Sequence, residues 1–216
     1  MPIDLYEMLG SAPCLSVKML LNHLKIPANL HHLNLPAGDH LKPEYLKLNP
    51  MHTIPTINDN GFALWESRTI LRYLVNQYAP GNDLYPNDPK KRAIVDRMLD
   101  FDLGTLYSAA AQWMYPPIFK KTPREPEKEK VLSDKLQLFD QLLATNRYAA
   151  GEHLTIADLS LLASVNTFYA AGHNMDQYQN IKSWWNRLEH ELPYYKELVP
   201  PHVDALNAWF APYKQK

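Results

Sequence analysis

The stretch IDLYEMLGSAPC, residues 3–14, decides the fold because it joins a strand pattern to a helix start through a glycine. The apolar positions of residues 3–9 suit a short strand that ends in a turn at Gly10. Pro13 fits the first turn of a helix, where a missing N–H group costs nothing. The helix is predicted over residues 14–24 by an apolar stripe at helical spacing, formed by Cys14, Val17, Leu20, Leu21 and Leu24.

Ser11 falls at the junction between this strand and this helix. A hydroxyl at such a junction lies beside unpaired backbone N–H groups and the positive end of a helix dipole. The position favours an anion, and a thiolate is one candidate. The alternative is that Ser11 only caps the helix, and the local sequence by itself favours this plainer interpretation because short serine-containing turns are common.

Charge and cysteine content narrow the function classes. The 216 residues have room for one large domain or two small ones. The 22 Lys and Arg residues balance 23 Asp and Glu residues, which gives no sign of nucleic-acid binding. The single cysteine excludes an internal disulfide and two-cysteine redox chemistry within the chain. The sequence shows no signal peptide and no membrane-spanning run, so we expect a cytoplasmic protein without membrane insertion.

The first part of the chain, residues 1–79, has the element order βαβ-α-ββα. A strand over residues 30–35 follows the first helix and should pair parallel to the first strand in a right-handed unit. Asn60-Gly61 lies between two short apolar runs and is a strong signal for a hairpin. The remaining elements are a helical turn over 43–48, the hairpin over 56–64 and a helix over 67–78. This order predicts a small mixed sheet covered by helices.

The second part, residues 90–216, is predicted to be all-helical. Residues 80–89 are rich in turn-forming residues and should form the linker between the two domains. Thr155 and Asp158 have the spacing of a capping box, and the helix that follows them is apolar nearly all round, which predicts the buried centre of the domain. Helices are expected over 89–113, up to 143, and over 156–171, 181–191 and 203–210.

Glu66, Ser67 and Arg68 form a polar group at a predicted helix start. Ser67 and the free N–H groups there would suit a carboxylate, Arg68 could add a charge-assisted bond to it, and Glu66 could bind an ammonium group. The set would therefore fit the head of an amino acid. A helix cap flanked by a surface ion pair explains the same residues equally well.

The loop around Thr53, Ile54 and Pro55 is the second candidate. An X-Pro bond at a strand edge can be cis, which would turn the Ile54 backbone outward to pair with an extended peptide. The loop histidines His40 and His52 could bind a second carboxylate, although loop histidines usually have no such role. No metal-ligand spacing, Gly-rich phosphate loop or GxSxG motif is present, so we expect no metal and no nucleotide.

Four segments together resemble cytosolic glutathione transferases, those of the insect delta class first and of the epsilon class next. They are SAPC at 11–14, NPMHTIP at 49–55, WESR at 65–68 and TIAD at 155–158. The resemblance covers nearly the whole chain. It implies a thioredoxin-like α/β N-terminal domain followed by an all-α C-terminal domain, a homodimer, and glutathione as co-substrate.

The resemblance also implies a role for each matching residue. Ser11 corresponds to the catalytic serine, whose hydroxyl donates a hydrogen bond to the glutathione sulfur. Ile54, beside a cis Pro55, corresponds to the residue whose backbone pairs with the cysteinyl unit. Asp158 corresponds to a capping residue needed for folding. The glutathione site implied is the γ-glutamyl set Glu66, Ser67 and Arg68, the glycine-carboxylate side His40 and His52, and the loop residues Thr53, Ile54 and Pro55.

A hydrophobic substrate pocket is expected beside Ser11. Leu9 stands where delta-class members usually have proline and Leu15 where arginine is common, and Ala110 occupies a position that is often aromatic, which suggests a roomier pocket. The expected pocket residues are Met8, Leu9, Pro13, Leu35, Tyr107, Ala110, Ala111, Met114, Tyr115, Ile118, Phe119 and Phe210.

These features predict a detoxifying transferase that conjugates glutathione to hydrophobic electrophiles and has glutathione peroxidase activity as a further option. The first alternative is a non-catalytic protein of the same fold that binds hydrophobic ligands or another protein. The second is a thiol transferase that uses Cys14.

Overall fold

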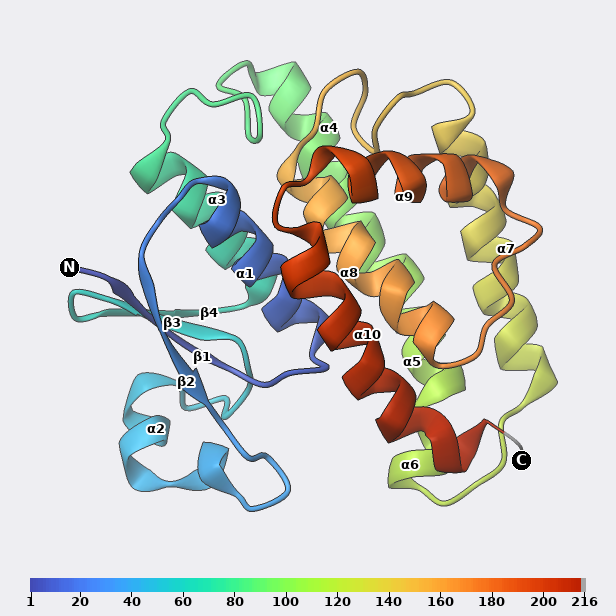
Figure 1. Cartoon of the computed structure of the whole chain (residues 1–216), viewed down its shortest axis with the longest axis horizontal. Coiled ribbons are helices and arrows are strands. Elements are labelled where there is room, and N and C mark those ends of the chain that lie inside the picture. The colour runs from blue at the N-terminus through green and yellow to red at the C-terminus, as the bar shows by residue number, and fades with distance from the viewer. Residues whose placement is uncertain (215–216) are drawn as a thin grey trace.

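The first half of the chain forms a four-stranded sheet between helices. The computed structural model describes residues 1–214, so the last two residues of the predicted helical domain lie outside it. The strands are ordered β2-β1-β3-β4, with β1 and β2 parallel and the other pairs antiparallel. Helices α1 and α3 lie on one side of the sheet and α2 on the other (Figure 1). The bounds are β1 Ile3–Glu7, α1 Ala12–His23, β2 Ala28–His32, η1 Asp39–Leu41, α2 Pro43–Leu48, β3 Thr56–Asp59, β4 Phe62–Trp65 and α3 Ser67–Tyr78.

This arrangement confirms the predicted thioredoxin-like α/β fold, and two strands differ from their expected bounds. β1 ends at Glu7, two residues early, because the chain turns there: the Ser11 N–H donates to the Met8 carbonyl at 3.2 Å, and Gly10 takes φ +86°. β2 covers Ala28–His32 instead of 30–35, because its pairing with β1 begins at Ala28 opposite Ile3.

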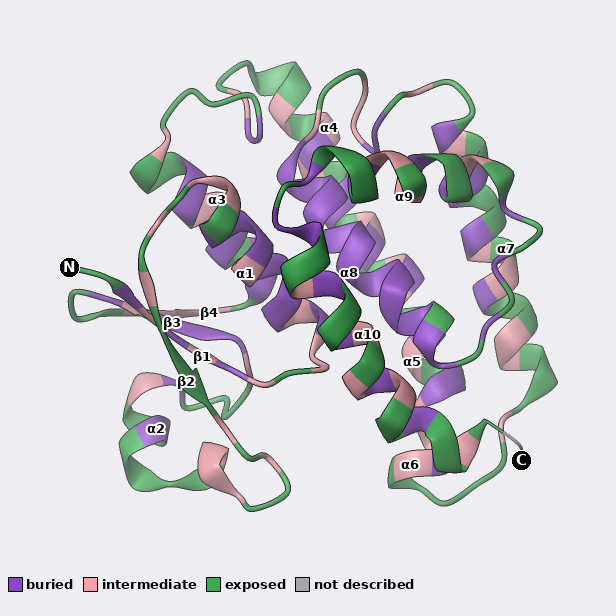
Figure 2. Cartoon of the chain, in the orientation of Figure 1, coloured by how far each residue is buried: buried purple, intermediate pink, exposed green. Residues whose placement is uncertain are grey.

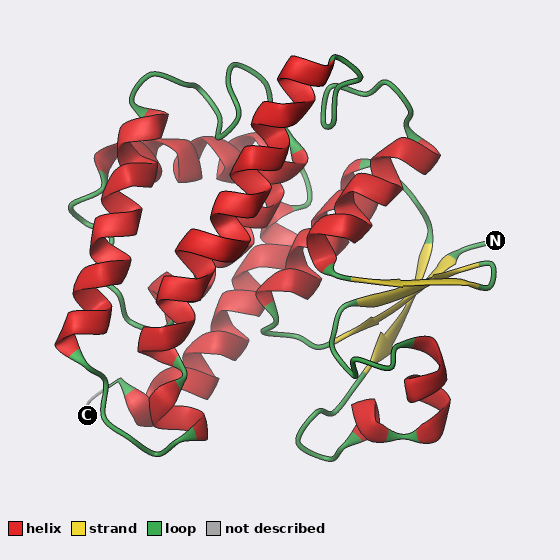
Figure 3. Cartoon of the chain, turned by 180° about the vertical axis from the view of Figure 1, so that it is seen from behind, coloured by secondary structure: helices red, strands yellow, loops and turns green. Residues whose placement is uncertain are grey.

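The second half is helical, as predicted. Helix α8 runs through its middle and is buried on nearly every side (Figure 2), in line with its continuous apolar sequence. Figure 3 shows the helical half from behind, with the sheet to one side of it. The bounds are α4 Pro89–Asp100, the π-helix η2 Phe101–Tyr107, α5 Ser108–Met114, α6 Pro116–Phe119, α7 Pro126–Leu143, α8 Ile156–Ala170, α9 Gln179–Glu191, α10 Tyr195–Phe210 and η3 Ala211–Tyr213.

Helix α10 begins at Tyr195, well before the predicted start at 203, and contains Pro200 and Pro201. A proline inside a helix removes one backbone hydrogen bond to the carbonyl four residues earlier. Here these carbonyls belong to Lys196 and Glu197, which are exposed, so water can satisfy them. The predicted long helix over 89–113 is likewise present, but it has a π-helical segment in its middle, which the sequence pattern did not indicate.

The capping box at the start of α8 is confirmed. Thr155 is the N-cap, and the fully buried carboxylate of Asp158 accepts hydrogen bonds from the backbone N–H groups of Thr155 at 2.9 Å and Ala149 at 2.7 Å. It also accepts from the Trp184 indole N–H at 2.9 Å. Burial raises the pKa of Asp158 above its ordinary value, while these donors favour the charged form. Asp158 thus joins α8, α9 and the preceding loop.

The two halves meet along α1. This helix packs against α3 on its own side and against α8 and α10 of the helical half. Its buried residues therefore form one continuous hydrophobic core with both halves. Among the described residues, no helix is both long and apolar enough to cross a membrane.

Candidate functional site

Ser11 caps α1 and also faces a cavity. It is the N-cap residue with φ −94° and ψ 111°, and its Oγ accepts a long hydrogen bond from the Cys14 N–H at 3.5 Å. The cap uses a lone pair of the hydroxyl oxygen and leaves its proton available to another acceptor. The capping interpretation of Ser11 is therefore correct but does not compete with a role in a site.

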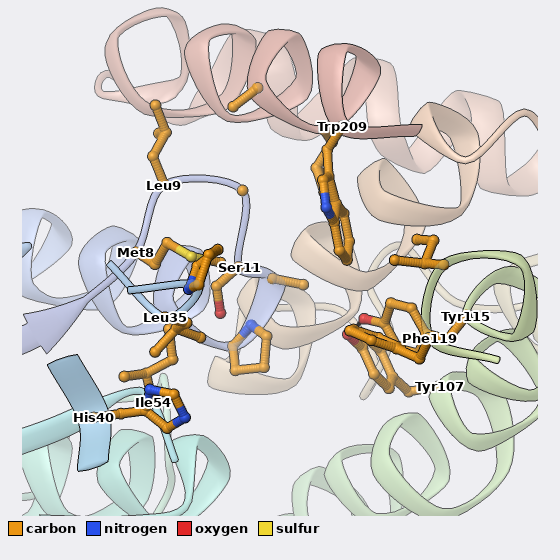
Figure 4. Close-up of a pocket in the computed structure, with 17 residues that line it drawn as sticks. Met8, Leu9, Ser11, Leu35, His40, Ile54, Tyr107, Tyr115, Phe119 and Trp209 are labelled. Atoms are coloured by element: carbon orange, nitrogen blue, oxygen red, sulfur yellow. Dashed lines mark hydrogen bonds between the residues drawn. The ribbon is translucent and has the colours of Figure 1, made fainter. Parts of the chain in front are cut away.

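The cavity lies between the two halves and has a volume of about 760 Å³. Figure 4 shows residues of the sheet-containing half on one side, and Tyr107, Tyr115 and Phe119 opposite, with Trp209 reaching in from α10. Eleven predicted site residues line it: Met8, Leu9, Ser11, Pro13, Leu35, His40, Ile54, Tyr107, Tyr115, Ile118 and Phe119. The structure thus brings together residues more than 100 positions apart in the sequence.

A buried polar network holds the loop that carries Ile54. The Tyr45 hydroxyl donates to the Thr53 carbonyl at 2.5 Å and contacts Thr56 Oγ1 at 2.9 Å. The Asn49 side chain donates to the same carbonyl and the same hydroxyl, each at 2.9 Å. The Ile54–Pro55 peptide bond is cis, as the resemblance implied. The loop before β3 is therefore fixed from inside, and Ile54 lies at the cavity wall.

Two predicted histidines lie close together beyond this loop. The rings of His40 and His52 have their centroids 6.0 Å apart. His40 is half-buried and lines the cavity, whereas His52 is exposed next to it. The Nδ1 atom of His40 is buried and has no hydrogen-bond partner among the described residues. The pair therefore leaves a polar nitrogen at the edge of the cavity.

The start of α3 forms the third part of the site. Glu66 is the N-cap residue, exposed and with φ +69°, and Ser67 begins the helix with its side chain largely buried. The first N–H groups of a helix have no partner inside it. This end of α3 therefore offers backbone donors and a hydroxyl beside a carboxylate that projects into solvent.

Arg68 differs from its expected role. Its guanidinium is buried and donates to the Asp102 carboxylate at 2.6 Å, and also to Ser67 Oγ at 3.1 Å. The Ser160 hydroxyl donates to the same Asp102 oxygen at 2.5 Å. A buried cation requires a buried counter-charge, which explains why Arg68 turns to Asp102 of η2 rather than outward. Arg68 can support Ser67 but is not itself open to solvent.

Four expected pocket residues do not line the cavity: Ala110, Ala111, Met114 and Phe210. A helix advances about 100° per residue, so Ala110 and Met114 lie on one side of Tyr107 and Tyr115 lies on the other. Both Ala110 and Met114 are fully buried in the core. Ala111 lies between the two tyrosines but has only a methyl group. The expected roomier pocket at Ala110 is therefore not found. Phe210 is also fully buried, and its neighbour Trp209 faces the cavity instead.

The comparison with known proteins identifies the family. Residues 5–82 match the model "Glutathione S-transferase, N-terminal domain" and residues 106–191 match "Glutathione S-transferase, C-terminal domain". A solved structure of a delta-class glutathione transferase of Nilaparvata lugens is 42% identical, with 98% of this chain and 100% of that chain covered and a TM-score of 0.95. The chain belongs to the glutathione S-transferase family.

Two further members of the family show how widely the likeness extends. A glutathione transferase of Bombyx mori, BmGSTD1, is 37% identical, covers 97% of this chain and 98% of its own, and has a TM-score of 0.92. An epsilon-class glutathione S-transferase of the housefly Musca domestica is 33% identical, with 99% and 98% covered and a TM-score of 0.92. The family resemblance seen in the sequence is confirmed, and the matches include both insect classes.

Within this glutathione S-transferase fold, Cys14 is a core residue. Its side chain is fully buried, and burial raises the pKa of its thiol to about 12. A thiol that is neither exposed nor ionised is unreactive, which argues against a thiol transferase that uses Cys14. Within residues 1–214, no group of three or more His, Cys, Asp or Glu side chains could hold a metal ion.

Helix α10 also contributes to the cavity wall, which was not predicted from the sequence. Ala205, Leu206 and Trp209 line the cavity, as do Gly10, Ala12 and Pro36 next to predicted residues. The spacing of Ala205, Leu206 and Trp209 places them on one helical face. Phe210, the neighbouring aromatic residue, was predicted instead, but it lies on the buried face of α10.

Proposed function

We propose that this protein conjugates the thiolate of glutathione to hydrophobic electrophiles, with the Ser11 hydroxyl stabilising the thiolate. The observation that carries the proposal is the position of Ser11, at the N-terminus of α1 and on the wall of a mostly apolar cavity. Family membership supports glutathione as the co-substrate. The non-catalytic alternative is less favoured because the Ser11 hydroxyl faces the cavity and keeps its proton available to a ligand, in addition to capping α1.

The three polar parts of the site match the three units of glutathione. The γ-glutamyl carboxylate would accept hydrogen bonds at the start of α3, from Ser67 and free backbone N–H groups, while Glu66 binds its ammonium group. The cysteinyl backbone would pair with that of Ile54. The glycine carboxylate would lie near His40 and His52. The sulfur would then lie near Ser11, since the cysteine is the middle residue of the tripeptide.

Ser11 can favour the thiolate without a general base. A free thiol has a pKa of about 8.5 and is mostly protonated at neutral pH. A hydroxyl donor and the dipole of α1 both favour the charged sulfur, and lowering the thiol pKa by one unit corresponds to about 1.4 kcal/mol. The thiolate would then attack an electrophilic carbon or reduce an organic hydroperoxide bound against Tyr107, Tyr115 and Trp209.

Replacing the serine tests this proposal. In Ser11→Ala we expect turnover with a generic electrophile to fall by about 10²-fold, the usual effect of losing one donor to a developing anion, while calorimetry shows that glutathione still binds. The pKa of bound glutathione, read from the ultraviolet absorbance of the thiolate, should rise. Ser183→Ala, on the exposed face of α9, serves as the matched control and should resemble the wild type.

Two outcomes would contradict the proposal. Wild-type protein that binds glutathione but turns over no electrophile would favour the ligand-binding alternative. A Ser11→Ala variant with normal turnover and an unchanged thiol pKa would remove the role of Ser11.

The finer assignments belong to the same proposal. Similarity to the delta-class enzyme of Nilaparvata lugens, which has the highest identity of the three structures described, favours the delta class. We also propose a cytoplasmic homodimer, as expected for this family. Sedimentation equilibrium would test the dimer, and a mass equal to one chain at micromolar concentration would exclude it.

A further inference from the structure

A buried carboxylate lies at the end of the strand that leads to Ser11. Glu7 is the last residue of β1 and points to the same side of the sheet as Ile3 and Leu5, so its side chain is only 1% exposed. It does not line the cavity, and no part of the proposed reaction uses it. A charge so deeply buried requires counter-charges close by.

Two basic side chains flank this carboxylate. On one side the Nζ atom of Lys18, from α1, lies 3.6 Å from Glu7 Oε2, and only 15% of the lysine side chain is exposed. On the other side His32, which is the partner of Glu7 in the parallel register of β1 and β2, places its Nδ1 atom against Oε1. A lysine is a cation at neutral pH, whereas a histidine changes its charge in this range. Glu7, Lys18 and His32 together form the Glu7 cluster.

The Glu7 cluster is connected to Ser11 through the first two turns of α1. Cys14 and Lys18 are four residues apart and therefore lie on the same face of this helix, and the Cys14 N–H donates to Ser11 Oγ at 3.5 Å. Burial raises the pKa of the Cys14 thiol most, and of the charges near it Glu7 raises this pKa further while Lys18 lowers it. Two helical turns, about 10 Å, separate Lys18 from Ser11. The electric field of the cluster therefore reaches the place proposed for the glutathione sulfur.

The other titratable groups around α1 do not share this position. His202 of α10 is fully buried, and burial lowers its pKa to about 4, so it is neutral at neutral pH. His31, next to His32, bonds Asp4 on the opposite side of the sheet. The charged residues of the helices that pack against α1 have partners of their own or are exposed: they are Arg68 and Arg72 of α3, paired with Asp102 and Asp96, Asp158 of α8, held by its capping network, and Lys196, Glu197 and Asp204 of α10.

We propose that the Glu7 cluster controls how readily the glutathione thiol ionises: Lys18 and protonated His32 favour the thiolate, and Glu7 opposes it while holding both cations in place. This inference rests on the proposed function, because it concerns the same sulfur. The cluster has no net charge when His32 is neutral and one positive charge when His32 is protonated. The three residues are positioning residues, since none of them lines the cavity.

Removing the charges one at a time tests the proposal, with the ultraviolet absorbance of bound glutathione thiolate as the readout. Lys18→Met should raise the pKa of the bound thiol by about 0.5–1 unit, the effect expected of one charge at about 10 Å inside a protein. Glu7→Gln should lower this pKa. The double variant Glu7→Gln/Lys18→Met should return close to the wild type, and Lys18→Arg, which keeps the charge, should match it. A merely structural disturbance would not produce shifts of opposite sign that cancel.

His32→Gln tests the pH-dependent part on a side chain that is 68% exposed, so folding is not at risk. Loss of the His32 proton makes the thiol less acidic, so the wild-type titration should extend over a wider pH range than a single proton gives. In His32→Gln the curve should fit a single proton, and the thiolate fraction at about pH 6 should be about 3-fold lower. His31→Gln, on the same strand but on the opposite side of the sheet, is the matched control and should follow the wild type.

The same titration separates this inference from the proposed function. Shifts of the same sign in Lys18→Met and Glu7→Gln, or no shift in either, would overturn the role of the Glu7 cluster. Identical curves for the wild type and His32→Gln would overturn the part of His32. If Ser11→Ala raises the thiol pKa while the cluster variants do not change it, this inference fails and the proposed function stands. A wild-type protein that leaves the thiol pKa at its free value would refute both.

Discussion

Replacing Asp158 by alanine should destabilise the protein severely. The Asp158 carboxylate is fully buried and accepts from three N–H groups, those of Ala149, Thr155 and Trp184, at 2.7 to 2.9 Å. Asp158→Ala leaves all three donors buried without an acceptor, at about 1–3 kcal/mol each before the structure relaxes. We expect the free energy of unfolding to fall by about 4 kcal/mol, a large part of the roughly 5–15 kcal/mol of a typical domain.

Urea-induced unfolding measures this loss, with tryptophan fluorescence as the signal because Trp184 contacts the carboxylate directly. Asp158→Asn should lose about half as much, since one amide oxygen still accepts while the new NH₂ group faces N–H donors. Asp134→Ala, exposed on α7, is the matched control. A loss of under about 1 kcal/mol in Asp158→Ala would refute the view that this carboxylate is the centre of the capping network.

Three further outcomes are expected. Asp102→Ala leaves the buried Arg68 guanidinium unpaired and should lower the free energy of unfolding by about 3–5 kcal/mol, measured in urea. Burial lowers the pKa of His202 to about 4, below the value of 6.5 for a free histidine, so the unfolded chain binds the proton first and stability falls as pH drops through this window. His202→Gln should therefore flatten the decrease in Tm between these two pH values. Gly10→Ala meets only ordinary contacts, at 3.8 Å from Ala205 and Leu206, but its φ of +86° should cost about 1–2 kcal/mol, seen as a lower urea midpoint.

The local pattern of the chain was enough to predict most elements. Helix α3 occupies the predicted residues 67–78, and Asn60-Gly61 forms the expected hairpin turn, because backbone preference and burial favour the same structure there. Helix α10 shows the opposite case. Pro200 and Pro201 argue against a helix locally, but packing against α1 and α8 favours one, and the residues with the freed carbonyls are exposed to solvent.

The cavity could be predicted only in part. Ser11, His40 and Ile54 follow short motifs whose geometry is set within a few residues. Tyr115 and Trp209 come into contact only through the packing of α5, α6 and α10. The helical period of the sequence identifies an apolar face of a helix, but it does not say which part of that face lines a cavity and which part packs in the core. Such contacts depend on the relative rotation of helices, for which a single sequence carries little information.

Helix α1 packs against α3 on one side and against α8 and α10 on the other. Its amide hydrogens can therefore exchange with solvent only when both halves of the molecule open together, and they should be among the slowest to exchange. A fragment cut after α3 would leave the outer side of this helix, including part of its buried set of Ala12, Cys14, Leu15, Val17, Met19, Leu20 and Leu21, in contact with water. We therefore expect the thioredoxin-like part to depend on the helices that follow it for its stability.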